Sequence, residues 1–175
     1  MASRRFFPLL AAALAIGVGA CTKPEEPRLQ PLTVAEVSGA RIWQRITQES
    51  DYDNWSNWPG HEGVQPGQSP HGKFHEVYIN NTLHDALPSS TSIAPEGAII
   101  VKENFDSNKK KVSYSVMVKV KGFNPAAGDW YWVAFDPTGK VLAEGARQSC
   151  IDCHTGMKSN DFVIIRRLDA PIAEQ

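Results

Sequence analysis

The sequence predicts a mainly β fold of the α+β class, in which an antiparallel sheet of about five strands is accompanied by one or two helices. Three observations lead to this prediction: five segments rich in β-branched and aromatic residues, turn sequences between them, and one earlier segment with helical spacing of its apolar residues. At 175 residues and 42% apolar content, the chain suffices for one folded domain.

The helical segment is residues 35–49, where Val37, Ile42, Trp43 and Ile46 recur at roughly helical intervals among charged residues. Residues 52–72 follow, and they are rich in Gly, Pro, Asn and Trp, which predicts a loop. A loop of this length is either functional itself or covers a pocket.

The predicted strands lie in the second half of the chain, at residues 74–80, 97–105, 111–120, 129–136 and 140–145. Residues 106–108 and 136–139 have the composition of tight turns. Short turns between successive strands predict antiparallel pairing.

The N-terminus has the features of an export signal, because Arg4 and Arg5 precede an apolar run over residues 6–20. That run is too short to span a bilayer comfortably. Cys21 follows small residues, as in a lipoprotein box. We therefore expect a signal peptide at residues 1–20, a lipid anchor on Cys21 with a Pro-rich tether to residue 33, and a folded domain at 34–175. The protein would be periplasmic and anchored to the outer membrane only through lipid; cleavage with soluble release is the alternative.

The charge of the chain is nearly balanced, with 18 basic and 19 acidic side chains and no block of like charge. A nucleic-acid-binding protein normally presents a clustered basic surface. We therefore expect no nucleic-acid partner.

Residues 149–156, SCIDCHTG, contain Cys150 and Cys153 with His154 directly after them. A thioredoxin-like pair would need much more chain after it, and a structural zinc site would need a second ligand pair. A c-type haem accounts for all three residues: the cysteines form thioethers with the haem vinyl groups and His154 binds the iron. We therefore predict haem c, covalently attached near the C-terminus.

Together these features resemble the cytochrome P-460 family, whose members are β-sheet c-type cytochromes related to the cytochromes c′-β. The resemblance covers roughly residues 43–166. It rests on the order and spacing of these segments: residues 54–55, 58–60, 70–72, 76–80, 95–97, 100–104, 128–132, the CIDCH box and residues 161–163. It implies an iron site that binds or oxidises small nitrogen compounds such as hydroxylamine and nitric oxide, a periplasmic redox partner, and possible homodimers.

The resemblance also assigns a role to Lys102, because in the namesake enzymes a lysine of the equivalent strand is bonded to the haem. Lys102 directly follows an apolar run, and a buried lysine loses its proton more readily and becomes nucleophilic. The alternative is a strand-end lysine that extends to water. Glu103 would lie on the opposite face of the strand.

The residue opposite His154 decides the function. By the resemblance, His75 replaces a distal arginine of the enzymes and could accept protons. An open site would suit nitrogen-oxide chemistry, whereas Met117 or a histidine as sixth ligand would make an electron carrier. A gas-binding protein would offer an apolar wall such as Phe105 or Phe123. His61, His71 and His84 could also serve the pocket or simply be structural.

Overall fold

The computed structural model describes residues 26–68 and 70–172. The predicted signal peptide and Cys21 therefore lie outside the described residues. Residues 26–33, expected to be tether, pack on the domain: Leu32 is buried in the core, and the backbone N–H of Asn81 donates to the Glu26 carboxylate. No helix in the described parts of the chain is long and apolar enough to cross a membrane.

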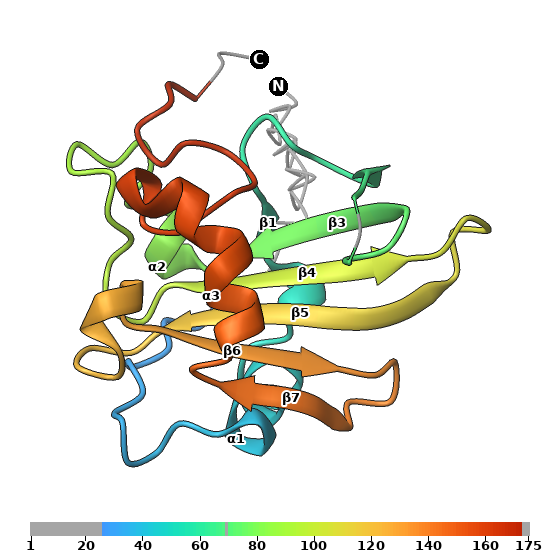
Figure 1. Cartoon of the computed structure of the whole chain (residues 1–175), viewed down its shortest axis with the longest axis horizontal. Coiled ribbons are helices and arrows are strands. Elements are labelled where there is room, and N and C mark those ends of the chain that lie inside the picture. Colours follow the sequence, from blue (N-terminus) through green and yellow to red (C-terminus); the bar gives the residue numbers. More distant parts are fainter. Residues whose placement is uncertain (1–25, 69, 173–175) are drawn as a thin grey trace, which may run out of the picture.

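An antiparallel sheet dominates the described residues, with the order β1-β3-β4-β5-β6-β7 and β2 paired to β3 (Figure 1). The strands are β1 (Ser56–Asn57), β2 (Gln65–Pro66), β3 (Phe74–Ile79), β4 (Ile99–Phe105), β5 (Lys111–Lys119), β6 (Trp130–Phe135) and β7 (Val141–Gly145). All five predicted strands are present, so the mainly β prediction is confirmed. The two short strands β1 and β2 lie in the segment predicted to be a loop.

The hairpin turns follow the chemistry that their sequences predict. In the β4–β5 turn, the Asp106 carboxylate accepts from the backbone N–H groups of Asn108 and Lys110. Asp136 makes the same pair of bonds with Thr138 and Lys140 between β6 and β7. An aspartate that bonds its own loop fixes the turn and therefore the strand register.

One face of the sheet packs against the N-terminal helix. Helix α1 (Gly39–Gln44) is capped by Ser38 and continues as a π-helical turn, Arg45–Glu49, so it begins four residues later than predicted. This helical segment packs on the strand residues of this face, and the resulting core comprises Leu32, Ile42, Ile46, Tyr52, Trp55, Ile99, Val101, Tyr114, Val116, Val118, Val120, Tyr131, Val133 and Phe135.

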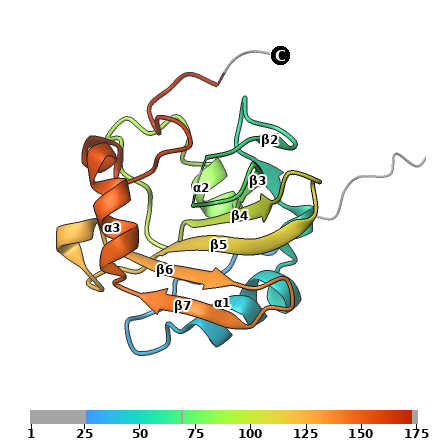
Figure 2. The same cartoon turned by 45° about the vertical axis from the view of Figure 1, so that its right-hand side comes forward.

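The opposite face carries α3 (Gln148–His154), which crosses in front of the sheet in Figure 1 and stands beside it in Figure 2. The short helix α2 (Asn81–His84), capped by Asn80, follows β3. A second apolar cluster fills part of this face, with Trp58, Val77, Ile79, Leu83, Ile100, Met117, Trp130, Trp132, Phe162, Val163 and Leu168 among its members. The rest of the face is hollow, and this hollow is the candidate site.

Candidate cofactor site

A cavity of about 460 Å³ lies between α3, the sheet and the loop before β3. Its volume is within the range of cofactor and ligand pockets. Alternate residues of the strands form its floor: His75 and Val77 from β3, Ile100 and Lys102 from β4, Ser115 and Met117 from β5, and Trp132 and Ala134 from β6. The walls are largely apolar and the few polar groups converge from different elements, as in a binding site rather than a packing defect.

Helix α3 presents the predicted haem box to this cavity. Cys150 and Cys153, three residues apart, lie on one face of the helix, and both line the cavity as free thiols together with His154 at the helix end. The sequence thus brings two thiols and an imidazole to one cavity wall, which is the donor set that a c-type haem requires.

His154 is held in an orientation that suits metal binding. Its Nδ1–H donates to the carbonyl of Phe162 at 2.7 Å, which assigns the proton to Nδ1 and leaves the lone pair on Nε2. The indole of Trp132 packs edge-on against the ring, with centroids 4.5 Å apart. Burial lowers the pKa of His154, and the nearby Lys102 charge adds to this effect, so the neutral, metal-binding form predominates.

Lys102 lies in the middle of the floor, where β4 pairs it with Val77 of β3 and Ser115 of β5. No hydrogen bond or ion pair reaches its amine from the described residues. Burial lowers the pKa of Lys102 to about 8. A sizeable fraction of this amine is therefore uncharged and nucleophilic near neutral pH.

Three histidines line the cavity near Lys102. His61 and His75 stack with centroids 5.1 Å apart, and their Nε2 atoms are 2.9 Å apart, so one ring donates to the other. Burial, followed by the Lys102 charge, lowers the pKa of His75 to about 4, and the same two causes lower the pKa of His71 to about 4. Both rings are therefore neutral at pH 7 and can accept a proton or bind a metal.

Two unpaired buried nitrogen atoms around the cavity suit a ligand with polar groups. Nδ1 of His75 and Nε1 of Trp132 are buried without a hydrogen-bond partner, and both residues line the cavity. Orphaned buried donors and acceptors are uncommon in native proteins and call for a partner. Arg147, exposed at the rim, is suited to pair with a carboxylate such as a haem propionate. The residues present thus fit the predicted haem.

Other sequence predictions have mixed outcomes. Met117 lines the cavity but is also buried in the second apolar cluster. Phe105 and Phe123, expected as an apolar distal wall, do not line it, and Phe123 packs in the core on the opposite face. His84 lies outside the cavity beside Asp85. The wall that a gas-binding protein was expected to draw from these two phenylalanines is therefore not formed by them; the alternation of β4 directs Phe105 away from Lys102.

Glu103 lies on the face opposite Lys102, as predicted, and it is paired rather than solvated. Its buried carboxylate accepts from the Tyr52 hydroxyl at 2.6 Å and forms an ion pair with Lys111. These contacts make Glu103 a structural residue of the other core.

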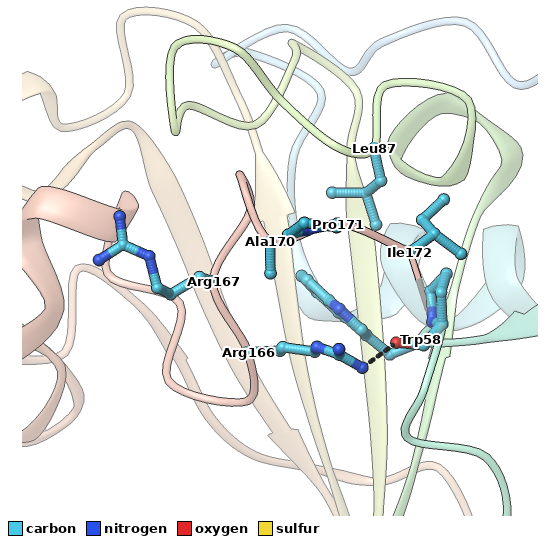
Figure 3. Close-up of a pocket in the computed structure, with 8 residues that line it drawn as sticks. Trp58, Leu87, Arg166, Arg167, Ala170, Pro171 and Ile172 are labelled. Atoms are coloured by element: carbon cyan, nitrogen blue, oxygen red, sulfur yellow. Dashed lines mark hydrogen bonds between the residues drawn. The ribbon is translucent and has the colours of Figure 1, made fainter. Parts of the chain in front are cut away.

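A second hollow, near Trp58 and the C-terminal segment, has a volume of only about 10 Å³, which is room for one water at most. Figure 3 shows Arg166 reaching toward Trp58 and donating to the carbonyl of Pro59, at 2.8 Å, whereas Arg167 extends away. Gly60 has a φ of +71°, which favours glycine, and a Cβ there would displace this guanidinium. The Arg166 hydrogen bond holds the C-terminal segment against the loop at Pro59, and the hollow is too small for a ligand.

Trp132 is one of the cavity residues that the sequence did not single out. It lies two residue pairs along from Ser115 and Ala134, on the same face of the sheet, because Met117 pairs with Trp132 across β5 and β6. Period-two alternation would have placed it on the floor once the hairpin register was known.

The family model described as cytochrome P460 matches residues 47–165, which is more than half of the chain. A sequence search of curated proteins returns no match.

Proposed function

Since the chain belongs to the cytochrome P460 family and is a c-type haem cytochrome, we propose that it binds and oxidises small nitrogen compounds, such as hydroxylamine or nitric oxide, in the cavity over the sheet. The observation that carries this proposal is Lys102, an amine without a hydrogen-bond or ion-pair partner among the described residues, in the cavity floor and with a pKa near 8. A purely structural lysine would extend to water or pair with an acid.

Cys150 and Cys153 would hold the haem through thioethers, and His154 would bind its iron through Nε2. When bound, the haem supplies an iron that takes a small ligand and accepts its electrons. The apolar floor residues, Val77 and Ile100 among them, exclude water from the bound ligand, which strengthens the polar contacts inside.

Lys102 stands where the family's haem-bonded lysine is expected, and its position in the floor supports that role. The uncharged amine is the form that can bond to a ring carbon or donate to a bound ligand. The residues around it, His61, His71 and His75, are all neutral bases, so no carboxylate competes for the amine.

Oxidation of hydroxylamine releases protons, and we propose that His75 relays them. It is buried in the cavity wall and neutral at pH 7, because burial and the Lys102 charge lower its pKa to about 4. Its Nε2 shares a proton with His61, which is half-buried in the loop before β2. The pair gives a proton a route from the cavity to the loop surface.

We further propose that the protein is exported to the periplasm, is anchored to the outer membrane through lipid on Cys21, and passes its electrons to a periplasmic redox protein. The N-terminal sequence supports export and lipidation. Replacing Cys21→Ser should then release the protein into the soluble periplasmic fraction with its haem attached. Membrane retention of that variant would refute the lipid anchor.

The decisive test compares hydroxylamine-dependent reduction of an artificial electron acceptor by the wild type, Lys102→Met and Lys110→Met. Lys110 is an exposed lysine in the β4–β5 turn and serves as the matched control. We expect Lys102→Met to lose at least 90% of the activity and any red shift of the absorption bands, while Lys110→Met retains both. An ordinary c-type spectrum with no hydroxylamine-dependent reduction in the wild type would refute the proposal and leave an electron carrier.

A further inference from the structure

His71 and His154 face one another across the cavity. His71 comes from the loop before β3 and His154 from the end of α3, and their ring centroids are 6.5 Å apart with the ring planes at 84°. Both rings line the cavity. Two neutral imidazoles at this separation are too far apart for a direct hydrogen bond and close enough to share one metal ion.

Each imidazole is fixed through Nδ1. His154 donates from Nδ1 to the carbonyl of Phe162, and Nδ1 of His71 is 3.0 Å from the hydroxyl oxygen of Ser115. The side-chain amide of Asn104 also donates to this hydroxyl and holds it in place. Nε2 of His71 and Nε2 of His154 have no hydrogen-bond partner in residues 26–68 and 70–172. A second contact that fixes one ring nitrogen and frees the other is the usual setting of a metal-binding histidine.

We propose that His71 is the second axial ligand of the haem iron in the resting protein, on the face opposite His154. Bonds between a transition metal and imidazole nitrogen are about 2.0 Å long. Two such bonds, together with the radii of the two rings, account for a centroid separation of this size.

The other candidates are less suited to the position. His75 and His61 already engage each other through their Nε2 atoms. Met117 is packed in the apolar cluster of the sheet. Among the described histidines, His71 alone combines a place in the cavity, a partner on Nδ1, a free Nε2 and a ring facing His154.

The backbone of the loop holds His71 at this place. Gly67 donates to the carbonyl of Lys73 at 2.7 Å and Lys73 donates to the carbonyl of Phe105 at 2.8 Å, which closes the loop onto the end of β4. Gly72 has a φ of +85°, and a Cβ there would lie 2.5 Å from the Phe105 carbonyl oxygen. Only glycine permits this approach, so the loop geometry is built around the residue next to His71.

If the protein oxidises nitrogen compounds as proposed above, on which this one step rests, such a compound would have to displace His71 to reach the iron. The site would be closed at rest and would open when the His71 side chain leaves. Ligand binding would then be limited by the dissociation of His71 rather than by diffusion.

The test uses the ferric holoprotein without added ligand, studied by electron paramagnetic resonance and near-infrared magnetic circular dichroism. We expect a low-spin signal with two imidazole ligands in the wild type. His71→Ala should become high-spin with haem content unchanged, and free imidazole should restore the low-spin signal. His84→Ala, a histidine outside the cavity, should resemble the wild type.

Carbon monoxide binding to the ferrous protein gives a second readout, which we expect to be at least tenfold faster in His71→Ala than in the wild type. If His71→Ala fails to fold, His71→Met should give the signature and the raised reduction potential of a His–Met pair. A high-spin ferric wild type, or a low-spin signal lost in His75→Ala and kept in His71→Ala, would overturn the inference. Failure of hydroxylamine oxidation alone would refute the proposed function and leave this ligand assignment intact.

Discussion

The buried ion pair between Lys119 and Asp161 links the sheet to the segment that orients His154. The Lys119 ammonium donates to both carboxylate oxygens of Asp161, at 2.7 and 2.6 Å, and both residues are less than 10% exposed. Asp161 also accepts from the backbone N–H of Ala94. We predict that Lys119→Met strongly destabilises the protein, because it leaves this buried carboxylate with one neutral donor.

The magnitude follows from the cost of an uncompensated buried charge. Removing one partner of a buried ion pair typically costs about 3–5 kcal/mol, whereas replacing both partners by neutral groups is often harmless. For a chain of this size, each kcal/mol lowers the melting temperature by about 2–4 °C. We therefore expect a loss of about 4 kcal/mol for Lys119→Met and recovery of most of it in Lys119→Met/Asp161→Asn, because asparagine can still accept from Ala94.

A local effect on the haem ligand should accompany the loss of stability. Asp161 and Phe162 both have positive φ, 54° and 63°, a conformation that costs energy in non-glycine residues. The carbonyl of Phe162 is the acceptor for Nδ1 of His154. Loosening of Asp161 therefore weakens the hydrogen bond that orients His154, the proposed iron ligand, and the reduction potential should shift in Lys119→Met.

The assay is denaturant unfolding of the ferric holoprotein, followed by far-ultraviolet circular dichroism and by haem absorbance. A loss of less than 1 kcal/mol in Lys119→Met would refute this reasoning. A double variant no more stable than the single one would also refute it, since the cost would then come from lost packing rather than from the stranded charge.

Three further predictions concern haem attachment, pH dependence and the opposite core. Cys150→Ala and Cys153→Ala should each leave one thioether and the double variant none, so denaturing extraction should release the haem from the double variant only; retention there contradicts the assignment. Burial lowers the pKa of His75 to about 4, whereas the unfolded value is near 6.5. The unfolded chain therefore binds the proton first as the pH falls. The free energy of unfolding should then decrease by at most about 3 kcal/mol between pH 6.5 and pH 4. His75→Asn should flatten this dependence in pH-resolved denaturation, and an unchanged slope would assign it to another group. Tyr52→Phe removes a donor from the buried Glu103 carboxylate and should cost about 1–3 kcal/mol in the same unfolding assay, whereas an unchanged stability would mean that water replaces the hydroxyl.

The strands could be predicted from the sequence because their information is local. Residues 111–119 alternate side chains between two faces, and the flanking aspartate turns fix where the hairpins begin. The placement of Cys150, Cys153 and His154 on one cavity wall could be predicted for the same reason, since the three residues are close together in the chain. The two-residue strands β1 and β2 were missed, because pairing this short leaves no periodic pattern.

The contacts that complete the site are long-range, and no local pattern encodes them. Lys119 and Asp161 are 42 residues apart, and His71 and Ser115 are 44 residues apart. The sequence singled out His71 as a candidate but not Lys119 or Ser115, and only the folded chain shows which residues meet. His71 in particular was equally consistent with a turn residue that caps the backbone.

The strand register explains why the sequence determines the position of Lys102 more firmly than the position of His71. Lys102 faces the cavity because β4 is paired on both sides, and a shift by one residue would turn Lys102 to the opposite core and bring buried Val101 into the cavity. Its place is therefore set by the whole apolar pattern of the sheet. His71 depends instead on the loop held by Gly67 and Gly72, outside the paired strands. A relative could thus keep a lysine at the position of Lys102 and lose or gain a histidine at the position of His71 through changes in this loop alone. The roles proposed for Lys102 and His71 should therefore be tested separately.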